Sequence, residues 1–220
     1  MKTNKTILNC LILTTVILFN SCSNNVKDKD GNAYKVVKIG AQQWIAENLN
    51  VSHFSNGEII TEAKTKEDWE KAGREGKPAW CYYDNTYNKK ENKNKLYNWY
   101  AVTDARGLAP ASWHIPNDTE WNKLIEYLGG ETSAGRKLKS ETGWNNKGNG
   151  TNESGFSALP GGFRFVSGFF INEGNNGLWW SSTEISKSLA WVRGLSYEGY
   201  AVGKSDGGKG NGFSVRCLKD

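Results

Sequence analysis

The sequence predicts a single domain of mixed α+β architecture, with helices in its first half and antiparallel strands in its second half. The chain has 220 residues with 25 Gly and 10 Trp, but only 1 Met and 4 Pro. This composition disfavours helix bundles and favours a loop-rich core built on aromatic rings. Helix signals lie before residue 130, and a Gly- and Asn-rich stretch, expected to form long loops, occupies 143–177. We find no internal repeat, so one domain extends from residue 30 to residue 220.

Residues 1–21 are predicted to be a signal peptide. Lys2 and Lys5 precede an apolar stretch at 7–19, which is shorter than the roughly 20 residues needed to span a bilayer. The sequence Phe19-Asn20-Ser21-Cys22 resembles the lipobox of bacterial lipoproteins, which implies that Cys22 becomes the lipidated first residue of the mature chain. A signal peptide cut at another position is the alternative. Residues 22–29 would then form a polar tether to the membrane.

The charge balance argues against a nucleic-acid partner. The formal net charge is +5 before the leader is removed. A lysine cluster at Lys89, Lys90, Lys93 and Lys95 is diluted by Glu91 and by asparagines. We therefore interpret this cluster as a solvated loop rather than a nucleic-acid surface.

The cysteine count predicts one disulfide. Of the 4 cysteines, Cys10 leaves with the leader and Cys22 carries the lipid. Cys81 and Cys217 remain as an even pair in a chain exported to an oxidising compartment. We therefore expect these two residues to be bonded.

The first predicted elements are a hairpin and two helices. Tyr34–Ile39 and Gln43–Leu49 flank a turn and are typical of a β-hairpin. Thr65-Lys66-Glu67-Asp68 resembles a capping box and predicts a short helix that ends near Gly73. Leu96–Val102 is apolar and aromatic, which favours a buried helix.

The clearest predicted element is an amphipathic helix over Asn117–Leu128. Asn117 can cap it, Glu120 occupies the reciprocal position of a capping box, and Gly129-Gly130 supplies a stop. Its apolar residues recur at i, i+3, i+4 and i+7, which places one face on the core. These residues are Trp121, Leu124, Ile125 and Leu128.

The second half of the chain predicts a small antiparallel sheet. Phe163–Val166 and Phe169–Ile171 flank Ser167-Gly168, which is a tight-hairpin signal. The further predicted strands are Leu178–Ser182, Leu189–Leu195, Tyr200–Gly203 and Gly212–Leu218, the last of which would close the sheet.

Several sequence blocks, in this order, carry a family resemblance. They are Gln43–Leu49 (QWIAENL), Leu96–Val102 (LYNWYAV), Gly107–Pro110 with Trp113–Pro116 (GLAP, WHIP), Thr151–Phe156, Leu159–Arg164 (LPGGFR), Trp179–Glu184 (WWSSTE) and Gly212–Cys217 (GFSVRC). With them, residues 30–220 resemble the Fibrobacter succinogenes major paralogous domain. The resemblance implies a C-type-lectin-like fold with two or three helices, related to formylglycine-generating enzymes, in a secreted or lipid-anchored bacterial protein without an established activity.

Ligand-binding candidates come from the aromatic and charged residues of the second half. Trp179 and Trp180 could stack on a sugar, but neighbouring strand residues point to opposite faces, so at most one can face a ligand. The remaining candidates are Trp191, Arg164, Glu184 and Glu153. Arg164 could instead form a salt bridge with a buried acid. Glu184 and Glu153 could instead be solvated loop acids.

Catalytic and metal-binding residues are less clearly indicated. His114 could act as a general base, although a lone histidine is more often structural. Glu153, Glu173, Glu184 and Asp206 could supply oxygen ligands to Ca²⁺, but their spacing fits no EF-hand loop. With 2 His in the chain, a multi-histidine metal site is excluded. We expect no cofactor.

The sequence therefore predicts a non-catalytic binding or adhesion module for an extracellular glycan or protein. It would be an outer-membrane lipoprotein of the cell envelope, on the periplasmic or the external side. One alternative is an oxidative or hydrolytic enzyme of the formylglycine-generating type, with Cys81 as nucleophile. The other is a purely structural envelope component.

Overall fold

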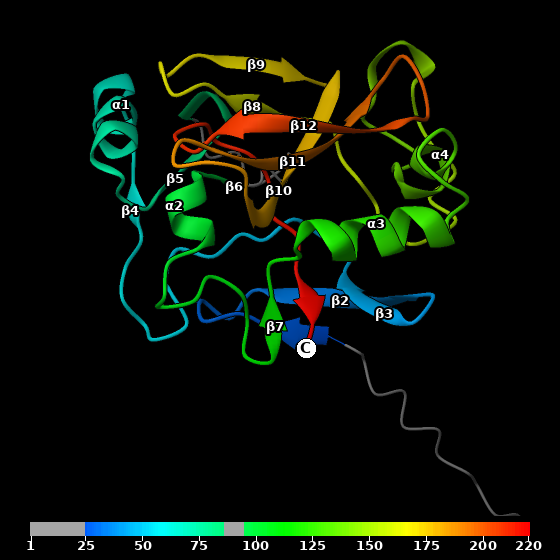
Figure 1. Cartoon of the computed structure of the whole chain (residues 1–220), viewed down its shortest axis with the longest axis horizontal. Helices are drawn as coiled ribbons and strands as arrows, with labels where there is room; N and C mark the ends of the chain where they lie inside the picture. The colour runs from blue at the N-terminus through cyan, green and yellow to red at the C-terminus, as the bar shows by residue number, and fades with distance from the viewer. Residues whose placement is uncertain (1–24, 86–94) are drawn as a thin grey trace, which may run out of the picture.

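The computed structural model describes residues 25–85 and 95–220, which form a mixed α+β fold as predicted. The described residues contain four α-helices and thirteen strands in three sheets. Figure 1 shows the sheet with β8 to β12 in the upper half and the sheet with β2, β3 and β7 in the lower half. The small single sheet expected from the sequence is thus an underestimate, because the early half of the chain supplies strands as well as helices.

The first sheet joins the two ends of the described chain. Its strand order is β1 (Asn25–Lys27), β2 (Ala33–Ile39), β3 (Gln42–Ile45), β13 (Leu218–Lys219) and β7 (Trp113–His114). The hairpin of β2 and β3 confirms the first predicted element. All pairs are antiparallel, and Leu218 lies opposite both Trp44 and His114. The last residues therefore fix the position of His114.

Residues 25–29, the part of the predicted tether that the structure describes, belong to the folded domain, which corrects the expectation of a polar linker there. Strand β1 pairs with β2, so that Val26 lies opposite Tyr34. Asp28 is buried and accepts a hydrogen bond of 2.5 Å from the Tyr34 hydroxyl. Asp28 also accepts hydrogen bonds from the backbone N–H groups of Asp30 and Asn32. These polar residues form a turn within the domain, because the carboxylate of Asp28 accepts from donors a few residues further along the chain.

The second sheet has the order β12 (Val202–Gly208), β11 (Leu189–Ser196), β10 (Asn176–Glu184), β8 (Gly161–Arg164) and β9 (Phe170–Glu173). Strands β8 and β9 form the predicted hairpin, with Gly168 at a φ of 85° in its loop. A left-handed conformation at that position explains the glycine. Strands β10 and β8 pair in parallel, which the sequence did not indicate.

The third sheet corrects the helix predicted over Leu96–Val102. Strand β5 (Ala79–Tyr82) lies between β4 (Thr61–Glu62) and β6 (Lys95–Tyr97). The chain forms a helix only after Asn98, which caps α2 (Trp99–Val102) by accepting from the Ala101 N–H. An apolar run that is buried on every side has no period, so the boundary between strand and helix was not readable.

Two helices follow their predicted capping boxes closely. Helix α1 (Lys66–Glu75) begins after Thr65 and ends at Gly76, which has a φ of 65°, rather than at Gly73. Helix α3 (Asp118–Tyr127) begins after Asn117, whose side chain accepts from the Glu120 N–H. A further short helix, α4 (Ala134–Leu138), was not expected. Two 3-10 turns occupy Tyr83–Asn85 and Asn145–Lys147.

The segment 212–217 threads between the sheets instead of forming the predicted closing strand. It makes isolated bridges from Gly212 to Arg164, from Phe213 to Tyr97 and from Ser214 to Trp179. All six of its residues are buried. Alternation of side chains therefore does not separate a core face from a solvent face here. Only Leu218–Lys219 continues as the regular strand β13.

Candidate functional site

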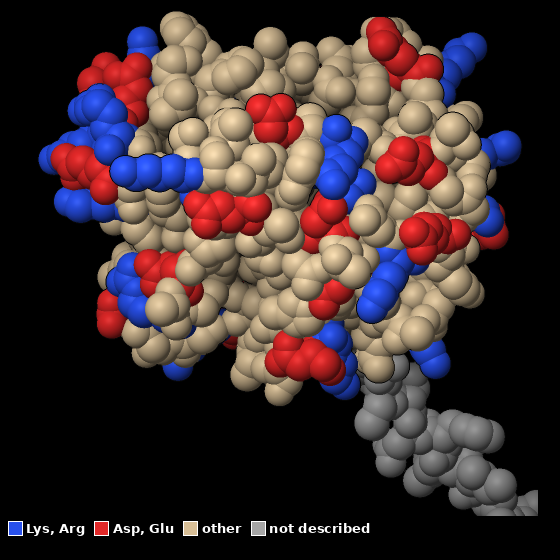
Figure 2. All heavy atoms as spheres, in the orientation of Figure 1, with Lys and Arg blue, Asp and Glu red and all other residues tan. Residues whose placement is uncertain are grey.

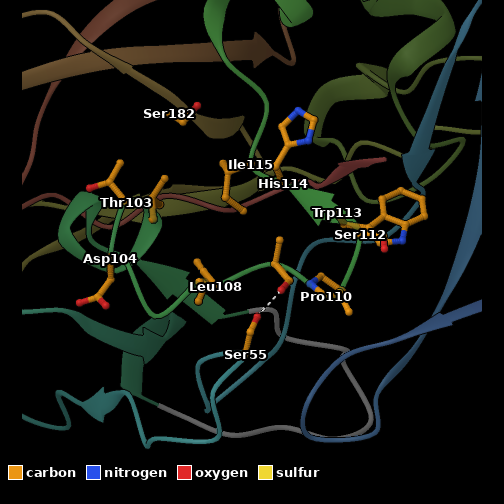
Figure 3. A pocket seen from close by; sticks show the side chains of 14 residues that line it. Ser55, Thr103, Asp104, Leu108, Pro110, Ser112, Trp113, His114, Ile115 and Ser182 are labelled. Carbon is orange, nitrogen blue, oxygen red and sulfur yellow. Dashed lines mark hydrogen bonds between the residues drawn. The ribbon is translucent and has the colours of Figure 1, made fainter. Parts of the chain in front are cut away.

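The candidate site is a pocket of about 580 Å³ between helix α2, strand β7 and the loop that joins them. Figure 3 shows Thr103 and Asp104 on one side and Trp113 and His114 on the other, with Leu108 and Ile115 between them. The remaining lining residues are Ser55, Val102, Gly107, Ala109, Pro110, Ala111, Ser112 and Ser182.

The α2 side of the pocket carries a paired carboxylate. Arg106 Nε and Nη2 each donate to Asp104, at 2.8 Å, and Arg106 Nη1 donates to Glu58 at 2.7 Å. These charge-assisted hydrogen bonds from Arg106 hold the pKa of Asp104 below its usual range, against the smaller opposing effect of burial. Asp104 therefore remains an anion that is already engaged.

On the opposite side, His114 is held between two carboxylates. Its Nε2 lies 2.9 Å from Glu120 Oε1, and its Nδ1 lies 2.7 Å from Asp220 Oδ1. Burial alone would lower the pKa of His114, but the hydrogen bonds to Asp220 and Glu120 outweigh it and raise that pKa. The imidazole thus links β7 to α3 and to the last residue of the chain.

Ser55, which lies in a different segment of the chain, holds the loop over 107–112 in place by two hydrogen bonds. The Ser55 N–H donates to the Gly107 carbonyl and its hydroxyl donates to the Ala109 carbonyl, each at 2.7 Å. Ser112 has a φ of 64°, an uncommon conformation for a residue other than glycine. The walls are thereby preformed, which reduces the entropy that a ligand would have to remove.

The pocket combines two titratable groups that already have charged partners with uncharged polar and apolar surface. Asp104 and His114 are the two lining residues with titratable side chains, and both have carboxylate or guanidinium partners. The other lining groups are hydroxyls, backbone groups and the apolar surface of Val102, Leu108 and Trp113. A small amphipathic ligand matches such a lining.

Comparison with known families identifies the chain. The model of the Fibrobacter succinogenes major domain matches residues 37–219. The chain belongs to that family. Its membership confirms the resemblance drawn from the sequence blocks, two of which, Gly107–Pro110 and Trp113–Pro116, lie along the pocket. No curated protein matches the sequence significantly.

In this member of the Fibrobacter succinogenes major domain family, the tryptophan pair is part of the core. Trp179 and Trp180 are both buried. Trp179 packs in the cluster of Trp44, Trp121 and Phe156, whereas Trp180 packs on the other side of the sheet against Phe213. Because both faces of β10 are covered, the structure removes both residues as ligand-binding candidates.

Arg164 is also excluded from ligand binding. It is fully buried and donates from Nε to the Gly168 carbonyl, from Nη1 to the Ala63 carbonyl and from Nη2 to the Thr65 carbonyl. The guanidinium fixes the loop of the β8–β9 hairpin against the start of α1. Its role is structural because it is fully buried and donates to three backbone carbonyls.

The other three candidates stay accessible but do not meet. Trp191 is half-buried, and Lys204 Nζ lies 3.9 Å from the centre of its ring. Glu184 is exposed and accepts from Lys209 Nζ at 2.5 Å, while Glu153 lies 3.9 Å from Lys137 Nζ. None of the three lines the pocket of His114. Within the described residues, no group of three or more His, Cys, Asp or Glu could hold a metal ion.

The predicted disulfide between Cys81 and Cys217 is absent from the structure, where both residues are free and buried. Cys81 packs with Trp69 and Leu96, whereas Cys217 packs in the cluster that includes Trp80 and Tyr97. Neighbouring residues of β5 and β6 point to opposite faces of the sheet, so these strands separate the two thiols. The number of cysteines in the sequence does not indicate that the two thiols lie on different sides of a sheet.

The lysine cluster is corrected at its last member. Lys95 is buried, donates to the Asn50 carbonyl at 3.1 Å and lies 4.0 Å from the centre of the Trp80 ring. Burial lowers the pKa of Lys95 to about 8.

On the face seen in Figure 2, acidic and basic side chains are interspersed between large uncharged areas.

The predicted leader and the lipidation site, Cys22, lie outside the described residues, as do Lys89, Lys90 and Lys93. Among the helices that the structure describes, none is long and apolar enough to cross a membrane.

The sequence does not predict the pocket itself. Trp113 belongs to a family block, and a lone histidine such as His114 indicates either a general base or a structural residue. The available signal was a Gly- and Pro-containing loop that carries a tryptophan and a histidine between two elements.

Proposed function

We propose that this protein is a non-catalytic binding module of the bacterial cell envelope, and that the pocket between α2 and β7 binds its ligand. The observation that carries the proposal is the mixed lining of this preformed 580 Å³ pocket, in which Trp113 and Leu108 lie beside Ser112 and Thr103. Hydroxyls and carbonyls beside an apolar wall complement a sugar ring, which has both polar and C–H faces.

The state of the cysteines disfavours an enzyme of the formylglycine-generating type. Such an enzyme needs a reactive cysteine pair, but Cys81 and Cys217 lie in different clusters. Burial raises the pKa of Cys81 to about 12 and also raises that of Cys217. A buried thiol with such a pKa has almost no thiolate at neutral pH, and the thiolate is the nucleophile.

The proposed setting follows from the leader and the fold. A lipid on Cys22 would hold the domain at the outer membrane, on the periplasmic or the external side. The sheet in which β13 pairs with β3 and β7 brings the two ends of the described part of the chain together, a feature that suits the C-type-lectin-like fold we propose. The pocket would then face an extracellular glycan or protein, of which we favour a glycan.

The test is binding of the mature protein to a glycan array and to purified envelope polysaccharides. We expect Trp113→Ala to weaken binding about threefold to tenfold through loss of aromatic contact. The matched control is Trp191→Ala, which removes another half-buried tryptophan outside the pocket and should leave binding unchanged.

Two outcomes would count against the proposal. If the mature protein binds no glycan but self-associates, the structural alternative would replace it. If Trp191→Ala abolishes binding and Trp113→Ala does not, the ligand site would lie on strand β11 instead of in the pocket. Circular dichroism of each variant shows that lost binding is not lost folding.

A further inference from the structure

A second, smaller pocket lies between the β2–β3 hairpin, the end of α3 and the loop that follows α4. Its volume is about 280 Å³. It is lined by Lys38, Ile39, Tyr127, Leu128, Lys137, Glu153 and Ser154, none of which lines the pocket of His114. The two pockets are therefore separate, and a ligand of the smaller pocket would be selected by its own polar and charged residues.

Tyr127 forms an exposed aromatic surface beside this pocket. It is 65% exposed, although it is a large aromatic residue at the last position of α3. Its ring lies against the turn at Gly40, where a Cβ atom would come within 2.8 Å of the ring carbon Cδ2. Gly40 has a φ of 60° and no side chain, so the hairpin turn supports the ring closely. An exposed ring supported in this way is ready to stack on a ligand.

The pocket carries a net positive charge. Lys38 and Lys137 contribute two cations, and Glu153 contributes one carboxylate. Glu153 lies 3.9 Å from Lys137 Nζ, while Lys38 has no ion-pair partner among residues 25–85 and 95–220. An anionic group that enters the pocket would therefore meet an unpaired cation.

The loop that carries Glu153 is held in place by backbone hydrogen bonds. The Asn152 N–H donates to the Lys139 carbonyl, and the Ser154 N–H and hydroxyl both donate to the Lys137 carbonyl. Glu153 thus lies between two residues anchored at the end of α4. The wall that it forms is therefore preformed rather than assembled by a ligand.

We propose that this pocket binds a pyranose ring that carries a carboxylate, as in a uronic acid. The ring stacks on Tyr127, and its carboxylate is attracted by Lys38 and Lys137. Stacking on an aromatic face requires a flat apolar ligand surface, and the net positive charge selects an anionic one. This site is separate from the pocket of Trp113, and the inference does not depend on what that pocket binds.

The experiment measures binding of trigalacturonate to the mature protein by calorimetry and by chemical-shift changes, with the neutral galactose trimer as control. We expect the acidic trimer to bind more tightly than the neutral one and to lose affinity as salt is added. Lys38→Gln and Lys137→Gln should each weaken binding about twofold to fivefold. Tyr127→Ala should weaken it about threefold to tenfold, while Tyr127→Phe keeps the ring and the affinity.

Glu153→Gln gives an effect of opposite sign, because it removes the one carboxylate of the pocket. It should tighten binding of trigalacturonate about twofold to fivefold. Trp113→Ala should leave this binding unchanged, which separates the site from the proposed glycan pocket. Equal binding of the two trimers, no binding of trigalacturonate, or insensitivity to Tyr127→Ala would overturn the proposal.

Discussion

Arg216 donates from Nε to the side-chain oxygen of Asn48 at 2.7 Å, across 168 residues of sequence. The same Asn48 oxygen accepts from Trp179 Nε1 at 2.8 Å, and Asn48 Nδ2 donates to the Ser214 hydroxyl at 3.1 Å. These four residues come from three blocks of the family resemblance. The three blocks therefore meet in one buried polar network, which gives these four residues a role in folding.

The network predicts a large effect at Asn48. Asn48→Leu should lower the free energy of unfolding by about 3 kcal/mol, because Trp179 Nε1 and Arg216 Nε would lose an acceptor inside the core. Urea denaturation measures the change. Asn56→Leu, on an exposed turn, is the control and should change stability by less than about 1 kcal/mol. Similar losses in both variants would contradict the assignment.

The free cysteines predict a chemical result. Alkylation of the native protein should leave Cys81 and Cys217 unmodified, because both are buried and burial raises the pKa of each thiol. After unfolding in denaturant without a reductant, both should be alkylated. Peptide mass spectrometry reads each position. A bridged Cys81–Cys217 peptide from unreduced protein would refute the structure at this point.

We expect the buried cation of Lys139 to stabilise the loops whose carbonyl groups it contacts. Its Nζ donates to the carbonyls of Gly148 at 3.0 Å, Ser196 at 2.5 Å and Gly199 at 2.6 Å. Lys139→Met keeps most of the side-chain volume but leaves these carbonyls without their donor, so we expect a loss of about 3 kcal/mol in thermal or urea unfolding.

The control for Lys139 is Lys137→Met, which removes a lysine that is more exposed and lies near Glu153. That change should cost at most about 0.5 kcal/mol. If the two variants were equally stable, the carbonyl contacts of Lys139 would contribute nothing measurable.

His114 predicts a pH-dependent contribution to stability. Its pKa is raised in the folded protein by hydrogen bonds to Asp220 and Glu120, despite the opposing effect of burial. A raised folded pKa means that the contribution is fully present below about pH 6.5, the unfolded value, and is lost as pH rises through the folded value. Urea titrations of the wild type and of His114→Gln test this. They are run at pH values between about 5 and 9, spaced by about one pH unit.

The expected sign is that the stability difference between wild type and His114→Gln shrinks as the pH rises. An Ile59→Ala variant, which changes an exposed apolar side chain and no titratable group, is the control for general effects of pH. A difference that grows with pH would show that neutral His114 is the form held in the fold.

Local signals in the sequence predicted local structure well. The capping boxes at Thr65 and Asn117 each begin a helix, and the hairpin around Gly168 forms as expected. These elements depend on hydrogen bonds between residues a few positions apart. The sequence did not predict the pocket of His114, because its walls come from segments at Ser55, at 102–115 and at Ser182.

Residue types and local spacing were enough to predict the family, the mixed class of the fold, and the helices and turns that have local caps. Which polar residues are buried, and which distant residues meet, is visible only in the folded chain. The tertiary structure placed both tryptophans of β10 in the core, Arg164 and Arg216 among backbone carbonyls, and Cys81 and Cys217 on opposite sides of a sheet. The physical reason is that burial and pairing depend on which distant segments pack together, and residue type and spacing along the chain do not contain that information.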